Sequence, residues 1–331
     1  MAGRRRKKSG GRSYAWRYRG RIVACMFVEV IIICALVIMI GWNKGVKEWF
    51  EQFEQPVLKE VDISGINSPN AILMQARGGK ILGEINGEAQ IYPASMTKIM
   101  TVILGIENFD DLDEKITLTN EMFSGLYEQD ATQAGFQPGE EVRVIDLLYG
   151  AMLPSGAECC IALADTISGS EADFAELMNK KARKLGMENT HFCDSTGLHN
   201  PDHYSTVKDI AVLMKYCIKN DTFREIVETS RHSTGVTNIH PDGITYYSTM
   251  FKNLSDPTVT GGKILGGKTG YTSEAGHCLV SFAEIEGREY IFVSAGASGA
   301  DGNTIPHIQD AVTVYNRVGA AVEAKMNDNN K

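Results

Sequence analysis

Residues 263–297 read KILGGKTGYTSEAGHCLVSFAEIEGREYIFVSAGA and contain three apolar, β-branched runs that are typical of strands. The runs are 263–270, 278–285 and 289–297. Glu286-Gly287 joins the last two. Nearer the N-terminus, a Gly78-Gly79 link between apolar runs is typical of a hairpin and predicts strands at 71–76 and 80–85. Strands at both ends of the chain therefore predict one antiparallel sheet built from both ends.

The chain between these strands has helical patterning and predicts a separate helical lobe. Predicted helices cover 94–108, 143–153, 157–168, 171–186, 207–219 and 305–322. Residues 110–140 are expected to form a polar loop region. Residues 191–206, rich in Asp, Asn, Gly and Pro, are expected to form an irregular surface loop. The predicted fold class is α+β.

The charge distribution separates a basic tail from an acidic body. Nine of the 33 Lys and Arg residues lie in residues 1–21, which leaves 24 basic residues against 41 acidic ones in the rest of the chain. This balance disfavours a nucleic-acid surface across the fold, because phosphate binding requires basic surface. Of the seven cysteines, two lie in residues 22–42. The other five cannot all pair within one chain, so free thiols are expected rather than a disulfide scaffold.

Residues 22–42, IVACMFVEVIIICALVIMIGW, form an apolar run of 21 interrupted by one ionisable residue, Glu29. A helix of this length reaches about 31 Å, which is sufficient to cross the hydrocarbon core of a membrane. The positive charges before the run place the N-terminus in the cytoplasm and the rest of the chain on the extracytoplasmic side. A cleaved signal peptide is the alternative, but the run is long for one and no small-x-small site follows it.

These segments predict five parts. Residues 1–21 form a basic cytoplasmic tail, 22–42 a single-pass signal anchor, and 43–62 a stalk with a short amphipathic helix. Residues 63–323 form the globular domain, and 324–331 a polar tail. Sequence leaves open whether the apolar face of the stalk helix packs on the domain or lies on the membrane surface.

Ser95-Met96-Thr97-Lys98 places a hydroxyl and an amine three residues apart at the start of a predicted helix, where they share a face. A neutral lysine can activate a serine as a nucleophile, and burial or a nearby positive charge lowers the lysine pKa. The same spacing recurs at Ser205 and Lys208, where it is expected only to cap a helix. By itself, Ser-x-x-Lys is therefore a weak indication.

Two further segments strengthen it. Lys268-Thr269-Gly270 ends a predicted strand, and small residues there let an extended substrate approach the strand backbone. Lys268 supplies a charge that could keep Lys98 neutral, and Thr269 a hydroxyl for a substrate carboxylate. Ser155-Gly156-Ala157 lies in a break between two predicted helices, where the serine could face a cleft and relay a proton.

The order Ser-x-x-Lys, Ser-x-x and Lys-Thr-Gly resembles that of the penicillin-binding proteins. Over residues 65–320 the sequence is similar to the serine D-alanyl-D-alanine carboxypeptidases of low molecular mass (peptidase S11). The resemblance is carried by IYPASMTKIMT (91–101), QPGEEVRVIDLLYGAMLPSGAE (137–158), NTHFCDSTGLHNPDHYST (189–206) and GGKTGYTSEAGHCLV (266–280). It implies the penicillin-binding and β-lactamase-like fold.

The resemblance also implies roles for seven residues. Ser95 would form the acyl-enzyme, Lys98 would be its general base, and Ser155 would relay protons to the leaving amine. Lys268 and Thr269 would bind the terminal carboxylate of a peptidoglycan peptide, beside Gly270. The backbone N–H groups of Ser95 and Tyr271 would form the oxyanion hole. No cofactor or metal is implied, and β-lactams would acylate Ser95 because they resemble the D-Ala-D-Ala terminus.

Two departures from the family pattern leave alternatives open. Ala157 stands where an asparagine is usual, and no basic residue appears at 298–301. A β-lactam sensor or wall-binding protein with low turnover therefore remains an alternative, as do a β-lactamase and a D,D-transpeptidase of the same fold. No clear deacylating glutamate lies between the second and third motifs, which disfavours a β-lactamase. A zinc peptidase is disfavoured because Pro201 separates His199 from His203 and no His-Glu-x-x-His is present.

Overall fold

The computed structural model describes residues 58–299 and 305–329. Its strands are β1 (Asn70–Gln75), β2 (Ile81–Ile85), β3 (Lys115–Thr117), β4 (Glu141–Arg143), β5 (Arg231–Ser233), β6 (Thr245–Tyr247), β7 (Thr258–Val259), β8 (Gly262–Thr272), β9 (Gly276–Ile285) and β10 (Arg288–Ala297). Its α-helices are α3 (Lys98–Asn108), α4 (Val144–Met152), α5 (Ala157–Ser168), α6 (Glu171–Leu185), α7 (Val207–Cys217), α8 (Asp221–Glu228), α9 (Thr249–Asn253) and α10 (Pro306–Asn329). Two 3₁₀ turns, η1 (Ala94–Thr97) and η2 (Glu121–Phe123), complete the set.

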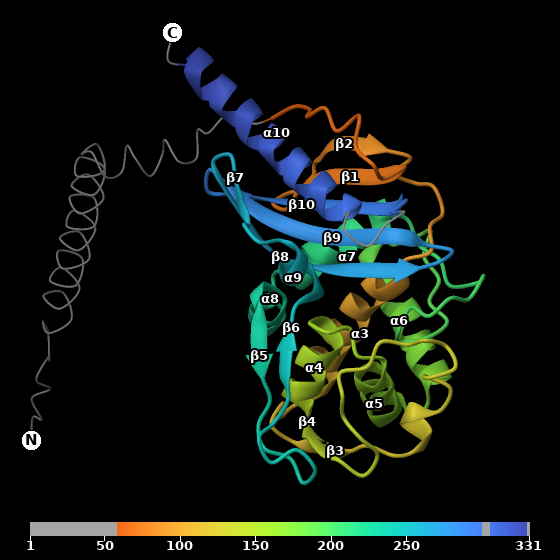
Figure 1. Ribbon diagram of the computed structural model, residues 1–331. Coiled ribbons are helices and arrows are strands. Elements are labelled where there is room, and N and C mark those ends of the chain that lie inside the picture. The colour runs from red at the N-terminus through yellow and green to blue at the C-terminus, as the bar shows by residue number, and fades with distance from the viewer. Residues whose placement is uncertain (1–57, 300–304, 330–331) are drawn as a thin grey trace, which may run out of the picture. The chain divides into compact units, whose positions relative to one another are not determined.

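The main sheet joins both ends of the described chain, as the sequence predicts. Its six antiparallel strands follow the order β2-β1-β10-β9-β8-β7 (Figure 1). The N-terminal hairpin pairs with the last strand, Ile72 lying opposite Val293. The predicted fold class, an antiparallel sheet with helices and a helical lobe, is confirmed for the described residues.

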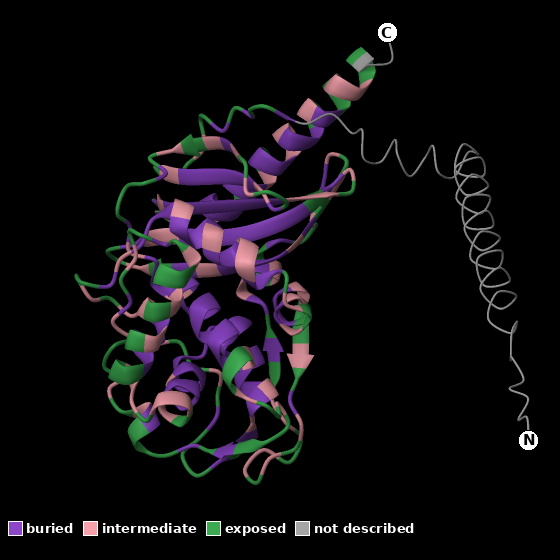
Figure 2. Cartoon of the chain, turned by 180° about the vertical axis from the view of Figure 1, so that it is seen from behind, coloured by how far each residue is buried: buried purple, intermediate pink, exposed green. Residues whose placement is uncertain are grey.

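Successive side chains along each strand point to opposite faces of the sheet. Each of the two faces is buried in a hydrophobic core. Ile72, Val280 and Val293 face the helical lobe and share its core. Leu73, Leu279 and Phe292 point the other way, into a second core that α10 covers. Figure 2 shows the central strands β1, β9 and β10 largely buried, while the outer surfaces of the helices are exposed.

Helix α3 runs through the middle of the helical lobe. Every residue from Lys98 to Gly105 is buried, and α4, α5 and α7 contact it. A helix that is buried on all sides is set by the tertiary structure around it. The buried position of α3 holds the residues at the N-terminus of this helix in place beneath the edge of the sheet.

Several segments differ from the sequence-based prediction. Helix α8, the β5–β6 hairpin and α9 were not predicted, and 110–140 is less of a loop than expected because β3 and η2 lie in it. Residues 324–329, predicted as polar tail, continue α10. The expected surface loop at 191–206 is irregular, but it is partly buried, and its polar groups hydrogen-bond to one another.

The predicted signal anchor at 22–42 and most of the predicted stalk lie outside the described residues. Leu58 and Val61, at the end of the predicted stalk, are buried in the core beneath α10. Within 58–299 and 305–329, the structure contains no helix of sufficient length and apolarity to cross a membrane. The five cysteines in this part of the chain carry free thiols, as expected.

Candidate active site

Ser95 and Lys98 lie on the η1 turn and the first residue of α3. The turn is 3₁₀ rather than the predicted α-helix, and it begins with Ala94 in the left-handed region at φ +47°. In a 3₁₀ turn the residues i and i+3 eclipse each other, so the two side chains still share one face. Lys98 Nζ lies 3.0 Å from Ser95 Oγ and 2.6 Å from the carbonyl oxygen of Thr196.

Lys98 is buried, and burial lowers the pKa of its amine. Asp194 and Glu158 carry charges that act in the opposite direction without cancelling the effect. The sequence-based prediction named burial and the charge of Lys268 as causes, and burial is the largest one. A lysine with a lowered pKa is more often neutral. A neutral amine can accept a proton from a neighbouring hydroxyl.

Ser155 and Lys268 meet across the cleft from different elements. Ser155 lies between α4 and α5 with φ +74°, a left-handed conformation that costs energy for a residue with a side chain. Lys268 lies in β8, and its Nζ is 3.0 Å from Ser155 Oγ and 2.9 Å from the Thr269 carbonyl oxygen. Burial, together with the charge of Lys98, holds the pKa of Lys268 well below its usual range. An anionic ligand would favour the charged form of this amine.

The other predicted residues follow Lys268 along β8. Thr269 Oγ1 lies 2.7 Å from Thr249 Oγ1 of α9. At Gly270 the strand passes so close to η1 that a Cβ would lie 3.0 Å from the Ser95 backbone nitrogen. Tyr271 is 60% exposed and extends over the cleft mouth. Ser95, Ser155, Thr269, Gly270 and Tyr271 line one cleft of about 690 Å³.

The cleft contains residues that the sequence did not single out. Thr249 has no local sequence signal, and only the fold places it beside Thr269. His277 and His307 stack with ring centres 5.0 Å apart and line the end of the cleft beyond Tyr271. Burial lowers the pKa of His307 to about 4, so this imidazole is neutral at pH 7.

Glu158 follows the unusual Ala157, and its carboxylate binds the backbone of a segment next to the cleft. The side chain is fully buried, and Oε1 accepts hydrogen bonds from the backbone N–H groups of Ala134 and Gly135 at 2.6 and 2.9 Å. Burial raises the pKa of this carboxyl group. The adjacent residues 129–132 form part of the cleft lining.

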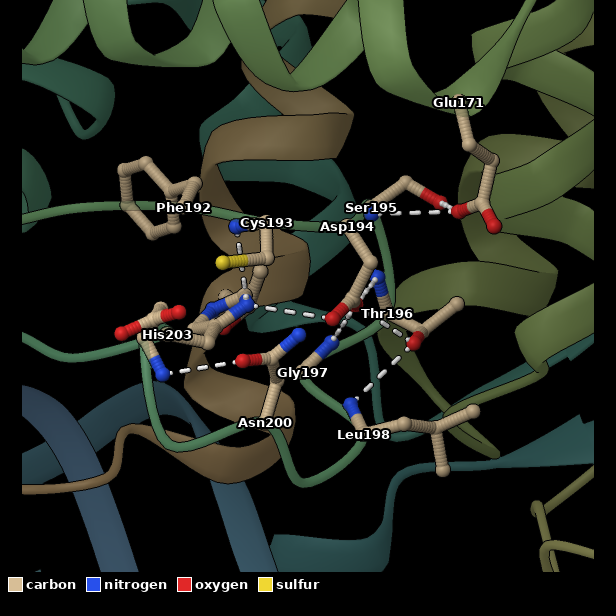
Figure 3. A network of polar contacts seen from close by, with 12 residues as sticks. Glu171, Phe192, Cys193, Asp194, Ser195, Thr196, Gly197, Leu198, Asn200 and His203 are labelled. Atoms are coloured by element: carbon tan, nitrogen blue, oxygen red, sulfur yellow. Dashed lines mark hydrogen bonds and ion pairs between the residues drawn. The ribbon is translucent and has the colours of Figure 1, made fainter.

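The two predicted histidines of the 191–206 loop have different surroundings. His199 is exposed and lines the cleft. His203 is buried, with Asp194 beside Nδ1 of the ring (Figure 3) and Thr97 beside Nε2. Thr206, beside the second Ser-x-x-Lys, caps α7 by accepting from the Asp209 N–H at 3.0 Å, as expected.

The arrangement is suited to acyl transfer. A hydroxyl lies beside a buried amine that can accept its proton, and a second amine with two hydroxyl groups lies on the opposite wall. The second amine and Thr269 could bind a carboxylate while Ser95 attacks a carbonyl group in the same cleft. The structure thus brings all seven predicted residues together.

Comparison with known proteins gives consistent matches. The family model Peptidase_S11, described as D-alanyl-D-alanine carboxypeptidase, matches residues 57–299. The chain is 35% identical over 231 residues to the D-alanyl-D-alanine carboxypeptidase DacF of Bacillus subtilis, covering 69% of this chain and 57% of DacF. It is 33% identical over 262 residues to DacC of Escherichia coli, covering 72% and 58%. The chain thus spans less than three fifths of the length of these two relatives.

A solved structure agrees with these matches. The DD-transpeptidase of Streptomyces K15 superposes with a TM-score of 0.70 at 30% sequence identity, covering 79% of this chain and 100% of that protein.

Proposed function

The chain belongs to the peptidase S11 family of D-alanyl-D-alanine carboxypeptidases, and on this premise we propose that it removes the terminal D-alanine from peptidoglycan stem peptides. The observation that carries the proposal is the 3.0 Å contact between Ser95 Oγ and the buried amine of Lys98. The 3.0 Å pair of Ser155 and Lys268 on the opposite side supports it. Together these groups supply a nucleophile, its base and a cationic carboxylate site.

The reaction begins when Ser95 Oγ attacks the carbonyl carbon of the peptide bond between the two D-alanines. Lys98 takes the serine proton as the C–O bond forms, and the backbone N–H groups of Ser95 and Tyr271 stabilise the oxyanion. Lys268 and Thr269 hold the terminal carboxylate, which places the scissile bond over Ser95. Binding by fixed groups of this kind supplies much of the rate by orienting the reactants.

Collapse of the oxyanion breaks the C–N bond, and Ser155 relays a proton to the departing amine. The Ser155 hydroxyl is suited to this step because it contacts Lys268 and lines the cleft. Water then attacks the ester of Ser95, with Lys98 again accepting a proton, and the serine is regenerated. A β-lactam also acylates Ser95 in the first step. Its leaving amine stays attached to the acyl group and remains in the cleft, so the ester persists.

Incubating the protein with a peptide that ends in L-Lys-D-Ala-D-Ala and measuring free D-alanine tests this proposal. We expect release by the natural protein and a loss of at least about 1,000-fold in Ser95→Ala, which should also lose labelling by fluorescent penicillin. Ser205→Ala is the control, because Ser205 has the same Ser-x-x-Lys spacing but lies outside the cleft. Penicillin labelling of Ser95→Ala would overturn the proposal.

A D,D-transpeptidase is the second candidate. The Streptomyces K15 structure, which this chain matches over its whole length, is named a DD-transpeptidase. The two activities differ in the acceptor of the acyl group, which is water in one and an amine in the other. Adding glycine to the assay separates them. A peptide product that carries glycine indicates transfer, whereas free D-alanine with only a shortened peptide indicates hydrolysis. Penicillin labelling without D-alanine release would instead favour a binding or sensing role.

We also propose that residues 22–42 anchor the chain in the cytoplasmic membrane, with residues 63–323 on the extracytoplasmic side. The 21-residue apolar run and the nine basic residues before it support this proposal. The full chain should sediment with membranes and remain there after a high-salt wash. Protease added to intact spheroplasts should degrade the globular domain, and protection of the domain would contradict the proposed orientation.

A further inference from the structure

A network of polar contacts is centred on Asp194, whose side chain is 20% exposed (Figure 3). Its Oδ1 atom accepts three hydrogen bonds of 2.7 Å, from the Thr196 N–H, the Thr196 hydroxyl and the Gly197 N–H. Its Oδ2 atom lies 3.1 Å from Nδ1 of His203. One carboxylate therefore fixes the turn 194–197 and joins it to a histidine nine residues further along the chain.

The turn that Asp194 fixes holds the amine of Lys98. The Thr196 carbonyl oxygen accepts a hydrogen bond of 2.6 Å from Lys98 Nζ, and Ser95 Oγ lies 3.0 Å from the same nitrogen. A neutral amine has two hydrogens and one lone pair. When one N–H points to Thr196, the nitrogen can turn its lone pair toward the Ser95 hydroxyl. The position of a single carbonyl group thus determines whether the amine is oriented to accept the serine proton.

A second arm of the network reaches the turn that carries Ser95. His203 Nε2 lies 2.9 Å from Thr97 Oγ1, and both side chains are buried. Nδ1 of the same ring faces Asp194 Oδ2 at 3.1 Å and the Cys193 backbone N–H at 3.2 Å, so the tautomer sets whether Thr97 or His203 donates in the Nε2 contact. Thr97 lies between Ser95 and Lys98 on η1. Asp194 is therefore linked indirectly to Lys98 through Thr196 and to the Ser95 turn through His203.

The charge of Asp194 acts on the same amine. Burial raises its pKa, but the hydrogen bonds from His203 and Thr196 outweigh this effect and lower the pKa to about 2, so Asp194 is ionised at pH 7. Its negative charge raises the pKa of Lys98, although burial lowers that pKa by more. The other groups that act on Lys98 are Glu158, Cys159 and Cys160 of α5 and Lys268 of β8.

We propose that Asp194 is a positioning residue for acylation, which orients the Lys98 amine through the Thr196 carbonyl group and the Ser95 turn through His203 and Thr97. The proposal rests on the proposed function, because it assigns a role relative to Ser95 as nucleophile. Asp194 itself contacts neither substrate nor reacting atoms. Its effect should therefore appear in the rate of the chemical step rather than in binding.

Acylation by fluorescent penicillin, measured over a range of concentration and pH, tests this role in Asp194→Asn and Asp194→Ala. We expect the maximal acylation rate to fall by about 10- to 100-fold, because small misplacements of reacting groups have effects of this size. The half-saturating concentration should change by less than about twofold, because Lys268 and Thr269 are untouched. If neither variant folds, Thr97→Val is the substitute. It removes only the Thr97 hydroxyl, which contacts His203, and should still slow acylation several-fold.

The pH profile separates positioning from a purely structural role. Acylation requires neutral Lys98, so its rate falls on the acid side of the Lys98 pKa. Removing the charge of Asp194 lowers that pKa, and the acid limb of Asp194→Asn should move to lower pH. Loosening of the loop alone would reduce the rate without moving the limb. Melting temperatures of all variants confirm that folded proteins are compared.

Asn200→Ala is the matched control in the same loop. The Asn200 side chain accepts a hydrogen bond from the Asp202 N–H at 2.9 Å and is not hydrogen-bonded to Asp194 or to η1. Its acylation rate and acid limb should equal those of the natural protein. The inference is overturned if Asp194→Asn keeps both the natural rate and the natural limb, or if Asn200→Ala reproduces the changes. Absence of labelling in the natural protein would instead count against the proposed function.

Discussion

At the scale of single residues, the two buried lysines have the same kind of surroundings. Lys98 lies between the Ser95 hydroxyl and the carbonyl oxygen of Thr196, and Lys268 lies between the Ser155 hydroxyl and the carbonyl oxygen of Thr269. Burial lowers the pKa of both amines, and each charge disfavours the other. A substrate carboxylate beside Lys268 would favour its charged form, which in turn favours neutral Lys98.

Lys98→Met should slow acylation by penicillin by about 100- to 10,000-fold, the range that general base catalysis contributes. Methionine fills a similar volume without a group that accepts a proton, so the free energy of unfolding should not fall. Lys208→Met is the control: Lys208 belongs to the second Ser-x-x-Lys but pairs with Glu88 at the surface. Stopped-flow labelling of both variants checks the prediction, and equal rates in the two would contradict it.

At the scale of elements, the site depends on close approaches between backbones. The turn at Gly197 lies against η1 so tightly that a Cβ would lie 1.9 Å from the Ala94 carbonyl oxygen. On the other side of η1, β8 approaches Ser95 at Gly270. Two glycines therefore allow a loop and a strand to clamp the same short turn, which fixes the direction of the Ser95 side chain.

Gly197→Ala should lower the free energy of unfolding by at least about 2 kcal/mol, because strain at φ +80° adds to the clash with Ala94. Acylation should fall with it, since η1 must shift. Gly169→Ala separates the two causes: Gly169 has φ +81° at the end of α5, but nothing lies within 4 Å of the added Cβ. That variant should lose about 1 kcal/mol and keep its acylation rate. Urea titration and penicillin labelling measure both quantities.

At the scale of the whole globular domain, α10 ties the first described residues to the sheet. Asp310 accepts four hydrogen bonds from Asn67 and Ser68, at distances of 2.6 to 2.9 Å. Arg317 donates to the carbonyl oxygens of Asp62 and Ser64. These contacts close the outer core over the face of the sheet opposite the helical lobe, far along the chain from Ser95.

Asp310→Ala should lower the free energy of unfolding by about 2–3 kcal/mol, because the donors of Asn67 and Ser68 lose their acceptor while Ser68 remains buried. The acylation rate of the folded protein should be unchanged, because Asp310 does not line the cleft. Gln309→Ala, at the exposed neighbouring position, should have no effect on stability. A variant of Asp310 that keeps natural stability would show that these bonds add nothing net.

Much of this architecture follows from local patterns in the sequence. The strands of 263–297, the N-terminal hairpin and most helices were predictable, because apolar periodicity, turn glycines and capping residues act over a few neighbours. Six of the seven predicted site residues lie in three short motifs whose order carries the resemblance to the family, and Tyr271 was named only because that resemblance implies it. Ser95 and Lys98 could be paired in advance, since residues three apart share a face in either kind of helix.

Tertiary structure alone decided the environment of those residues. The lowered pKa of Lys98 depends on its burial in the centre of the lobe, and its orientation depends on Thr196, 98 residues away. Thr249, His203 and Asp194 join the site through contacts that no local pattern encodes. Desolvation and hydrogen bonding between distant segments are properties of the packed chain. The residues could therefore be named from the sequence, but their protonation and side-chain orientation arise only on folding.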